Sequence, residues 1–246
     1  MATTELTTVL ESELALPSIS EALPNDFNKA RFVQNCMALV TGTPELAKYP
    51  KEKLVPGLLK GAYLGLDFFN KECYLIPYGS DLNFQIDYKG MTKLVKKYSI
   101  RPVNDIYARI VREGDEFEEG LEHNEPFINF NPKPFNTGKI LGAFAVCQFS
   151  DGGIKYEVMN KDELDTAKRM SKAQNGTAWQ HFSGEMYKKT VLRRLCKNIP
   201  MDMDFHQTQI IDGEYEETTI AREEATNPWT TTTAETPIYD ISPSAN

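Results

Sequence analysis

The chain of 246 residues lacks the patterns by which enzymes and metal proteins are usually recognised. It has three histidines, His123, His181 and His206, and none belongs to a metal or nucleophile motif. The four cysteines are scattered without a C-x-x-C pair, which predicts reduced thiols in a cytoplasmic protein rather than a disulfide framework or a zinc site. A phosphate-binding G-x-x-x-x-G-K-[ST] loop is also missing. We therefore expect no catalytic residues, no metal and no cofactor.

Long apolar runs are missing too. No stretch approaches the about 20 apolar residues that a membrane-spanning helix needs. Glu5, Glu11 and Glu13 precede any basic residue, which is unlike a secretory signal peptide. The acidic run 113–125 has carboxylates such as a two-metal nuclease uses, but it lies in a predicted loop, so a solvated charged segment is the better interpretation. These absences favour a soluble protein that acts by binding.

The net charge of −8 speaks at first against nucleic-acid binding, but its distribution reverses that conclusion. Residues 1–82 hold 7 basic and 10 acidic residues, residues 83–200 hold 19 and 15, and residues 201–246 hold 1 and 10. The middle of the chain is therefore basic and the last segment strongly acidic. Charge read by segment predicts a nucleic-acid-binding middle followed by an acidic tail.

Periodicity and turn residues predict an α+β fold, with a small antiparallel sheet of hairpins packed with several helices. We expect residues 1–24 to be an arm with one or two amphipathic turns. Residues 25–200 form the expected core for DNA binding and oligomerisation. Residues 201–246 are expected to be an acidic flexible tail for partner contact, disordered from residue 207 onward because they have few aliphatic runs.

Turn signals and glycines place the individual elements. Residues 114–138 are acidic and rich in Pro and Asn, which predicts a long loop with short extended pieces. Gly57, Gly61 and Gly65 share one face of a predicted helix, where they permit close approach of another backbone, from protein or DNA, or simple helix packing. The expected helices are 26–42, 51–66, 88–98, 161–171 and 179–198, and the expected strands are 73–78, 82–87, 103–113, 141–149 and 154–159.

Two predicted helices carry a cationic face opposite an apolar one. The helix at 88–98 has Lys89, Lys93, Lys96 and Lys97 on one side. In the helix at 179–198, the cationic face comprises Lys189, Arg193 and Lys197, with Lys188 and Arg194 beside it. Neither face has enough acidic partners for pairing along the helix, and stacked like charges destabilise a helix. A phosphate backbone would relieve that repulsion, while the alternative is an ordinary solvated face.

Aromatic residues accompany these basic helices. Bases stack on aromatic faces without sequence preference, so Tyr88 and Trp179 are candidate platforms. Each aromatic is also a candidate core residue, and Trp179 can instead anchor the last helix. Arg109 and Arg112, on the predicted strand 103–113, complete the candidate DNA-binding set.

Four motifs resemble one known family. Residues 82–90, LNFQIDYKG, look like the FQI-x-YKG signature of the RecT family of phage-type single-strand annealing proteins. Residues 74–78 are similar to its Y-L-V-P-Y strand, and residues 64–66 to the L-G-L that ends the preceding helix. Residues 186–193 match its M-x-x-K-T-x-L-R helix. Order and spacing agree over about residues 25–200.

The sequence departs from the family pattern at two places. Asp87 stands where glycine is common, and Gly57 and Gly61 replace residues that are more usual in a helix. The resemblance implies that the signature positions of the family, here Gln85, Tyr88, Lys89, Lys189 and Arg193, are DNA-binding residues.

The resemblance implies a recombination protein from a bacteriophage or prophage that acts in the bacterial cytoplasm. It implies ATP-independent annealing through single-stranded DNA and an annealed duplex intermediate, and a homo-oligomer in the form of a ring or helical filament. It also implies a C-terminal segment that contacts an exonuclease or a host single-strand-binding protein. Alternatively, the acidic tail competes with DNA. Two other functions stay open: a nucleic-acid-binding module without annealing activity, and a metal-dependent nuclease that uses Asp115 and Glu116.

Overall fold

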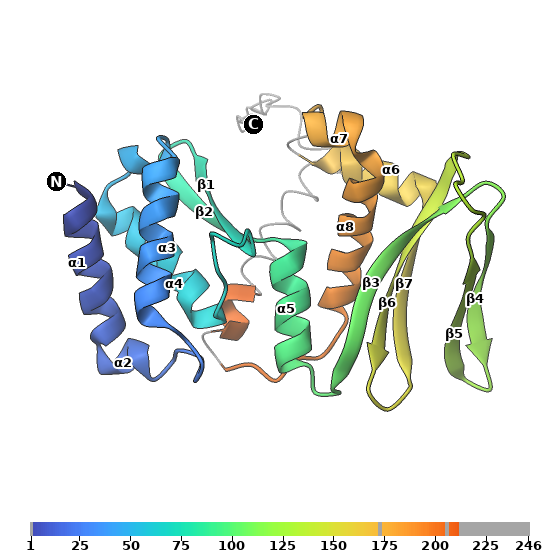
Figure 1. The fold of residues 1–246 in the computed structure, drawn as a ribbon, viewed down its shortest axis with the longest axis horizontal. Helices are drawn as coiled ribbons and strands as arrows, with labels where there is room; N and C mark the ends of the chain where they lie inside the picture. Colours follow the sequence, from blue (N-terminus) through green and yellow to red (C-terminus); the bar gives the residue numbers. More distant parts are fainter. Residues whose placement is uncertain (1, 172–173, 205–206, 212–246) are drawn as a thin grey trace, which may run out of the picture.

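Two groups of elements lie at opposite ends of an elongated chain, with two helices between them (Figure 1). The computed structural model describes residues 2–171, 174–204 and 207–211. The first group contains α1 (Ala2–Ala15), α2 (Pro17–Ser20), α3 (Lys29–Gly42), η1 (Leu46–Lys48), α4 (Lys51–Leu64), β1 (Cys73–Tyr78) and β2 (Asp81–Ile86). The second group contains β3 (Val103–Arg112), β4 (Glu116–Glu122), β5 (Glu125–Asn131), β6 (Ile140–Phe149), β7 (Ile154–Asn160), α6 (Lys161–Met170) and α7 (Thr177–His181). Between them lie α5 (Tyr88–Tyr98) and α8 (Ser183–Lys197).

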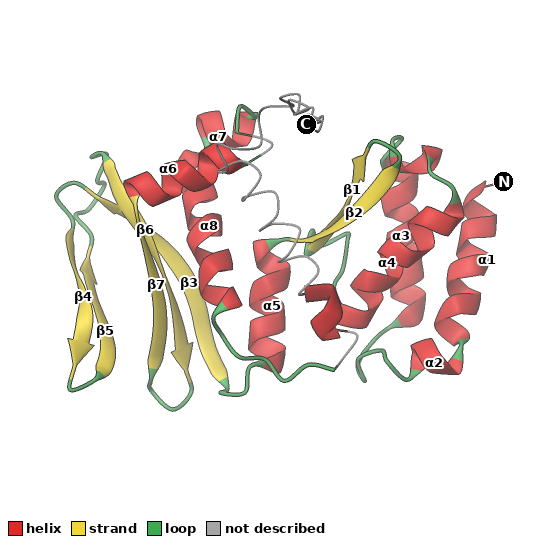
Figure 2. Cartoon of the chain, turned by 180° about the vertical axis from the view of Figure 1, so that it is seen from behind, coloured by secondary structure: helices red, strands yellow, loops and turns green. Residues whose placement is uncertain are grey.

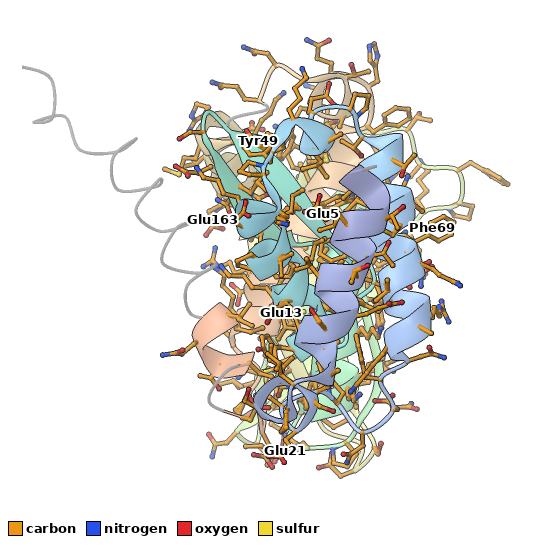
Figure 3. All side chains as sticks on the ribbon, turned by 90° about the vertical axis from the view of Figure 1, so that its left-hand side faces the viewer. Glu5, Glu13, Glu21, Tyr49, Phe69 and Glu163 are labelled. Carbon is orange, nitrogen blue, oxygen red and sulfur yellow. The ribbon has the colours of Figure 1, made fainter. Side chains whose placement is uncertain are left out.

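The N-terminal segment is a packed helix rather than the expected arm of one or two turns. Leu6, Leu10 and Leu14 follow one another at every fourth residue, and all three are buried where α1 packs against α3 and α4. Glu5 and Glu13 occupy other faces of α1, which lies nearest the viewer in Figure 3. The burial of three leucines stabilises this helix as part of the main core.

The glycine face of α4 lets other parts of the protein pack closely against the helix. A Cβ atom at Gly57 would lie 2.5 Å from Leu75 Cδ1, and one at Gly61 would lie 2.7 Å from Phe68 Cε2. These glycines therefore let the β1–β2 hairpin and the segment before it pack closely on α4. Gly65, with φ of 64°, ends the helix in the left-handed conformation that glycine adopts readily.

The second group is built on a three-stranded antiparallel sheet in the order β3-β6-β7. Helices α6 and α8 cover one face, and the β4–β5 hairpin packs on the other (Figure 2). This hairpin replaces the long loop expected at 114–138. Phe117 and Phe130 point inward, with ring centroids each 5.1 Å from that of Phe144. His123 and Asn124 form its turn, both with positive φ as a tight primed turn requires.

Helix α5 has the bounds expected from the sequence. Asp87 Oδ1 accepts a hydrogen bond from the Lys89 amide at 3.2 Å, so the acid that departs from the family pattern is the N-cap of this helix. A Cβ atom at Gly90 would lie 2.2 Å from Glu72 O. Glycine is therefore required where the helix passes the backbone that precedes β1.

The expected helix at 179–198 is two helices, α7 and α8, separated at Phe182 with φ of −127° and ψ of 37°. Residues 199–204 and 207–211 then pack against α5 and the first group. Asp202 N donates to Tyr98 O at 2.7 Å, and the buried Gln207 side chain donates to Tyr63 O at 2.9 Å. The described residues up to 211 are thus packed rather than part of a free tail. The rest of the expected tail, 212–246, lies outside the described residues.

Candidate nucleic-acid interface

Two hollows lie at the centre of the chain, on either side of the start of α5. The first, here called the signature hollow, has a volume of about 220 Å³ and is lined by Tyr74, Gln85, Ile86, Asp87, Tyr88, Met186, Lys189, Thr190 and Arg193. The second, here called the lysine hollow, has a volume of about 530 Å³ and is lined by Glu72, Lys89, Thr92, Lys93, Lys96, Lys97 and Ile106.

The signature hollow joins two segments about one hundred residues apart in sequence. On one side, Tyr74 and Gln85 are cross-strand partners in the β1–β2 hairpin, so their side chains share a face. On the other side, one face of α8 supplies residues at positions i, i+3, i+4 and i+7, from Met186 to Arg193. Four of the five signature positions therefore meet at one place, and the fifth, Lys89, lines the neighbouring hollow.

The signature hollow is lined by aromatic rings from β1 and the start of α5 and by cations from α8. Lys189 Nζ lies 5.1 Å from the centroid of the Tyr88 ring, within range of a cation–π contact. The Arg193 guanidinium donates a hydrogen bond to Ile86 O, so it ties α8 to the end of β2 and is held in place there. Burial raises the pKa of the Tyr74 hydroxyl, and the nearby Asp87 carboxylate raises it further.

Three lysines of α5 have acidic partners, and all of these partners lie outside the helix. Lys93 pairs with Glu72 at 2.8 Å and also donates to Gly65 O at 2.9 Å. The carboxylates come from other elements, so pairing along the helix did not reveal them. The other pairs are Lys96 with Asp105 at 3.3 Å and Lys97 with Asp26 at 2.5 Å.

These pairs reduce the charge that the lysine hollow offers to phosphate. They also tie α5 to the segments before α3 and β1 and to strand β3. Lys89 forms no ion pair with any residue that the structure describes, and it is exposed. It is therefore the lysine of α5 best placed for a phosphate contact.

Two further basic residues of α8 are engaged in ion pairs away from the signature hollow. Arg194 pairs with Glu157 at 2.7 Å and with Glu163 at 3.1 Å, so it faces β7 and α6. Lys188 pairs with Glu185, one turn earlier on the same helix, at 2.6 Å. Their places favour a structural contribution over direct contact with a strand in either hollow.

The remaining cations of the predicted set lie elsewhere. Arg109 shares its sheet face with Tyr107, its guanidinium 5.8 Å from that ring, on the face opposite α8. Arg112 Nη1 donates to Gly138 O at 2.8 Å and so holds the loop after β5. Lys197 is exposed in the last turn of α8 and lines neither hollow.

Trp179 is a core residue in this structure. It is only 4% exposed, packs edge-on against Tyr187 with centroids 5.8 Å apart, and its Nε1 donates to Ser171 Oγ at 3.3 Å. Its ring is therefore not available for base stacking, and it anchors α7 to α8 instead. The exposed aromatic nearby is Phe182, at 62% exposure, one turn before Met186 of the signature hollow. Periodicity gave no signal for Phe182, since its exposure depends on the break between the two helices.

Within the part of the chain that the structure describes, no group of three His, Cys, Asp or Glu side chains could hold a metal ion. Over the same residues, no helix combines the length and apolar character needed to cross a membrane.

Comparison with known proteins agrees with the motifs at the signature hollow. A model of the RecT family matches residues 30–228. Protein RecT from Escherichia coli (strain K12) is 28% identical over 210 residues, which cover 80% of this chain and 77% of that protein. The matched range includes both segments that form the hollow.

Proposed function

The chain belongs to the RecT family of single-strand annealing proteins of DNA recombination, and we propose that it pairs complementary strands without ATP. In this proposal the bound single strand follows the signature hollow and the exposed Lys89 beside it. The observation that carries the proposal is the meeting of Gln85 and Tyr88 with Lys189 and Arg193 from a distant helix. Cations beside aromatic rings are the features by which proteins hold single strands without reading sequence.

Annealing in this way needs no catalytic residue. Pairing is downhill, because each stacked step of DNA contributes about 1.4 kcal/mol on average. The obstacle is kinetic, since single strands repel one another and fold on themselves. A protein that neutralises phosphates and keeps a strand extended removes both obstacles. Assembly of many copies into a ring or filament would join weak sites into one continuous track.

The acidic C-terminal segment supplies a second part of the proposal. Residues 212–246 hold 8 acidic residues and 1 basic residue. We propose that this segment binds a protein partner, either an exonuclease or a host single-strand-binding protein. A chain ending at Ile211 would keep the packed turn that precedes it. Loss of partner binding on this truncation supports docking, whereas tighter DNA binding supports competition between tail and DNA.

The deciding experiment is an annealing assay with two complementary labelled oligonucleotides in the absence of ATP. The wild type is expected to accelerate pairing, and Lys189→Ala is expected to lose most of that acceleration while staying folded. Lys60→Ala is the matched control, since Lys60 is an exposed lysine that lines neither hollow. Tight binding without acceleration would overturn the proposal and leave a strand-binding module. Metal-dependent degradation of the oligonucleotides would favour a nuclease.

A further inference from the structure

The residues that follow α8 connect the two walls of the signature hollow. One wall is the β1–β2 hairpin, which packs on α4, and the other wall is α8. Helix α5 lies between them, since it packs against β2 on one side and against α8 and β3 on the other. The spacing of the two walls therefore depends on how firmly α5 is held. Residues 199–204 and 207–211, here called the strap, lead from the end of α8 past α5 to α4 (Figure 1).

The strap holds the C-terminal end of α5 through its backbone. Asp202 N donates to Tyr98 O at 2.7 Å, and Ile100 N donates to Pro200 O at 3.2 Å. The two segments also form an antiparallel β-bridge between these hydrogen bonds. The end of α5 is thus fixed to the residues that come directly after α8.

One buried amide joins the strap to both α4 and α5. Gln207 is 4% exposed, and no other amide or charged side chain in the described part of the chain is buried. Its Nε2 donates to Tyr63 O of α4 at 2.9 Å and to the Tyr98 hydroxyl of α5 at 3.1 Å. Its Oε1 accepts from the Asp204 amide at 3.3 Å, so both polar atoms of the side chain have partners. A buried polar group with all its hydrogen bonds made specifies one arrangement of the segments that it joins.

We propose that Gln207 is a positioning residue for the DNA site, because it holds α4, α5 and the strap in the arrangement that sets the spacing between the hairpin and α8. This inference rests on the proposed function, and it extends the DNA-binding core to residue 211. Gln207 lines neither hollow, so it acts through the elements that it joins and not through contact with the strand. Without its hydrogen bonds the walls adopt several spacings, of which one fits the strand. If that spacing is populated about one tenth of the time, single-strand affinity falls about tenfold.

Two truncated chains and one substitution test the role of the strap in binding. A chain that ends at Met203 is expected to bind labelled oligothymidine about tenfold more weakly than a chain that ends at Ile211, since both lack the acidic segment and only the shorter one lacks Gln207. In the full chain, Gln207→Leu removes the amide and is expected to weaken binding about tenfold as well.

The control for stability is Leu10→Ala, because Leu10 is fully buried in α1 and its loss destabilises the fold outside the strap. Binding is compared at a temperature where circular dichroism shows every variant folded. Leu10→Ala is expected to bind like the wild type under these conditions. Equal losses of affinity for Leu10→Ala and Gln207→Leu, or no loss for Gln207→Leu, would overturn the inference.

A distance measurement separates positioning from stability. Spin labels at Lys60→Cys on α4 and Thr177→Cys on α7 report the spacing of the two groups by double electron–electron resonance, since both positions are exposed and line neither hollow. The four native cysteines are buried and stay unlabelled in the folded chain. We expect one narrow distance distribution with Gln207 intact, and a broader one for Gln207→Leu that narrows again when oligothymidine binds.

An equally narrow distribution for Gln207→Leu without DNA contradicts the positioning role. If the wild type accelerates annealing in that case, the proposed function stands and only this inference fails. If the wild type does not accelerate annealing, the proposed function fails whatever the distances show.

Discussion

The ion pair between Lys93 and Glu72 allows a sharp test of the lysine hollow. The Glu72 side chain is 14% exposed and that of Lys93 is 43% exposed, so the pair is partly shielded from solvent. Glu72→Gln removes the negative charge but keeps an oxygen that can accept the hydrogen bond from the Asp67 amide. If a strand passes along α5, the variant makes Lys93 available for one more phosphate contact.

The expected size follows from the pair and from counterion release. Partly exposed pairs are worth up to about 1 kcal/mol, so the gain in single-strand affinity is at most about fivefold at low salt. One added phosphate contact steepens the dependence of log affinity on log salt by about 0.7 for single strands. Between about 50 and 200 mM salt, the advantage of the variant should therefore shrink by about 2.6-fold.

Fluorescence anisotropy of a labelled oligothymidine over a salt series measures both quantities. Asp151→Asn is the control, because Asp151 pairs with Arg101 at 2.8 Å and neither residue lines a hollow. An unchanged affinity and an unchanged salt slope for folded Glu72→Gln would refute the argument. The α5 lysines would then serve only to hold the helix between its neighbours.

Three further predictions concern the core and the aromatic residues. Leu10→Ala should lower the free energy of unfolding by about 2–5 kcal/mol in a denaturant titration, because Leu10 is fully buried, whereas Glu11→Ala on the same helix should have little effect. Trp179→Phe should lower thermal stability but leave single-strand affinity unchanged, whereas Phe182→Ala should weaken binding by about 1–3 kcal/mol at unchanged stability if a base stacks there. A hydrogen bond to Glu119 and partial burial raise the pKa of Tyr156 to about 12. Because the folded pKa lies above the ordinary value of about 10, this bond stabilises the fold fully below about pH 10 and is lost as pH rises toward about 12, so the difference in thermal stability between wild type and Tyr156→Phe should shrink over that range.

The elements with regular local patterns were predictable from the sequence. Helix α5 begins and ends where expected, because its apolar and cationic residues alternate with helical period and Asp87 caps its first turn. The β4–β5 hairpin was missed for the opposite reason. Glutamates dominate the composition of this segment, so the apolar pattern of Phe117 and Phe130 on the inner face was not recognised. The composition of this segment therefore predicted a loop, whereas the alternation of inward and outward side chains forms two paired strands.

The candidate site was predictable in its residues but not in its partners. The two signature segments were recognised separately, and their meeting at one hollow agrees with a single binding surface. The acids that pair with the α5 lysines come from other elements, so spacing within one helix could not reveal them. The direction of Arg109 depends on strand parity, which the sequence leaves open because both faces of β3 carry apolar residues. Tertiary contacts therefore decide which cations line a hollow.

Three consecutive residues at the start of α5 have three different roles. Tyr88 lines the signature hollow, Lys89 lines the lysine hollow, and Gly90 leaves room for Glu72 O. Glu72 in turn pairs with Lys93 through its side chain, so its backbone positions the helix while its carboxylate reduces the charge on the lysine face. A change at Gly90 would therefore shift both hollows together, whereas a change at Tyr88 or Lys89 alters one of them. A binding defect caused by a change at Gly90 must therefore be separated from a folding defect, whereas changes at Tyr88 and Lys89 each test one hollow.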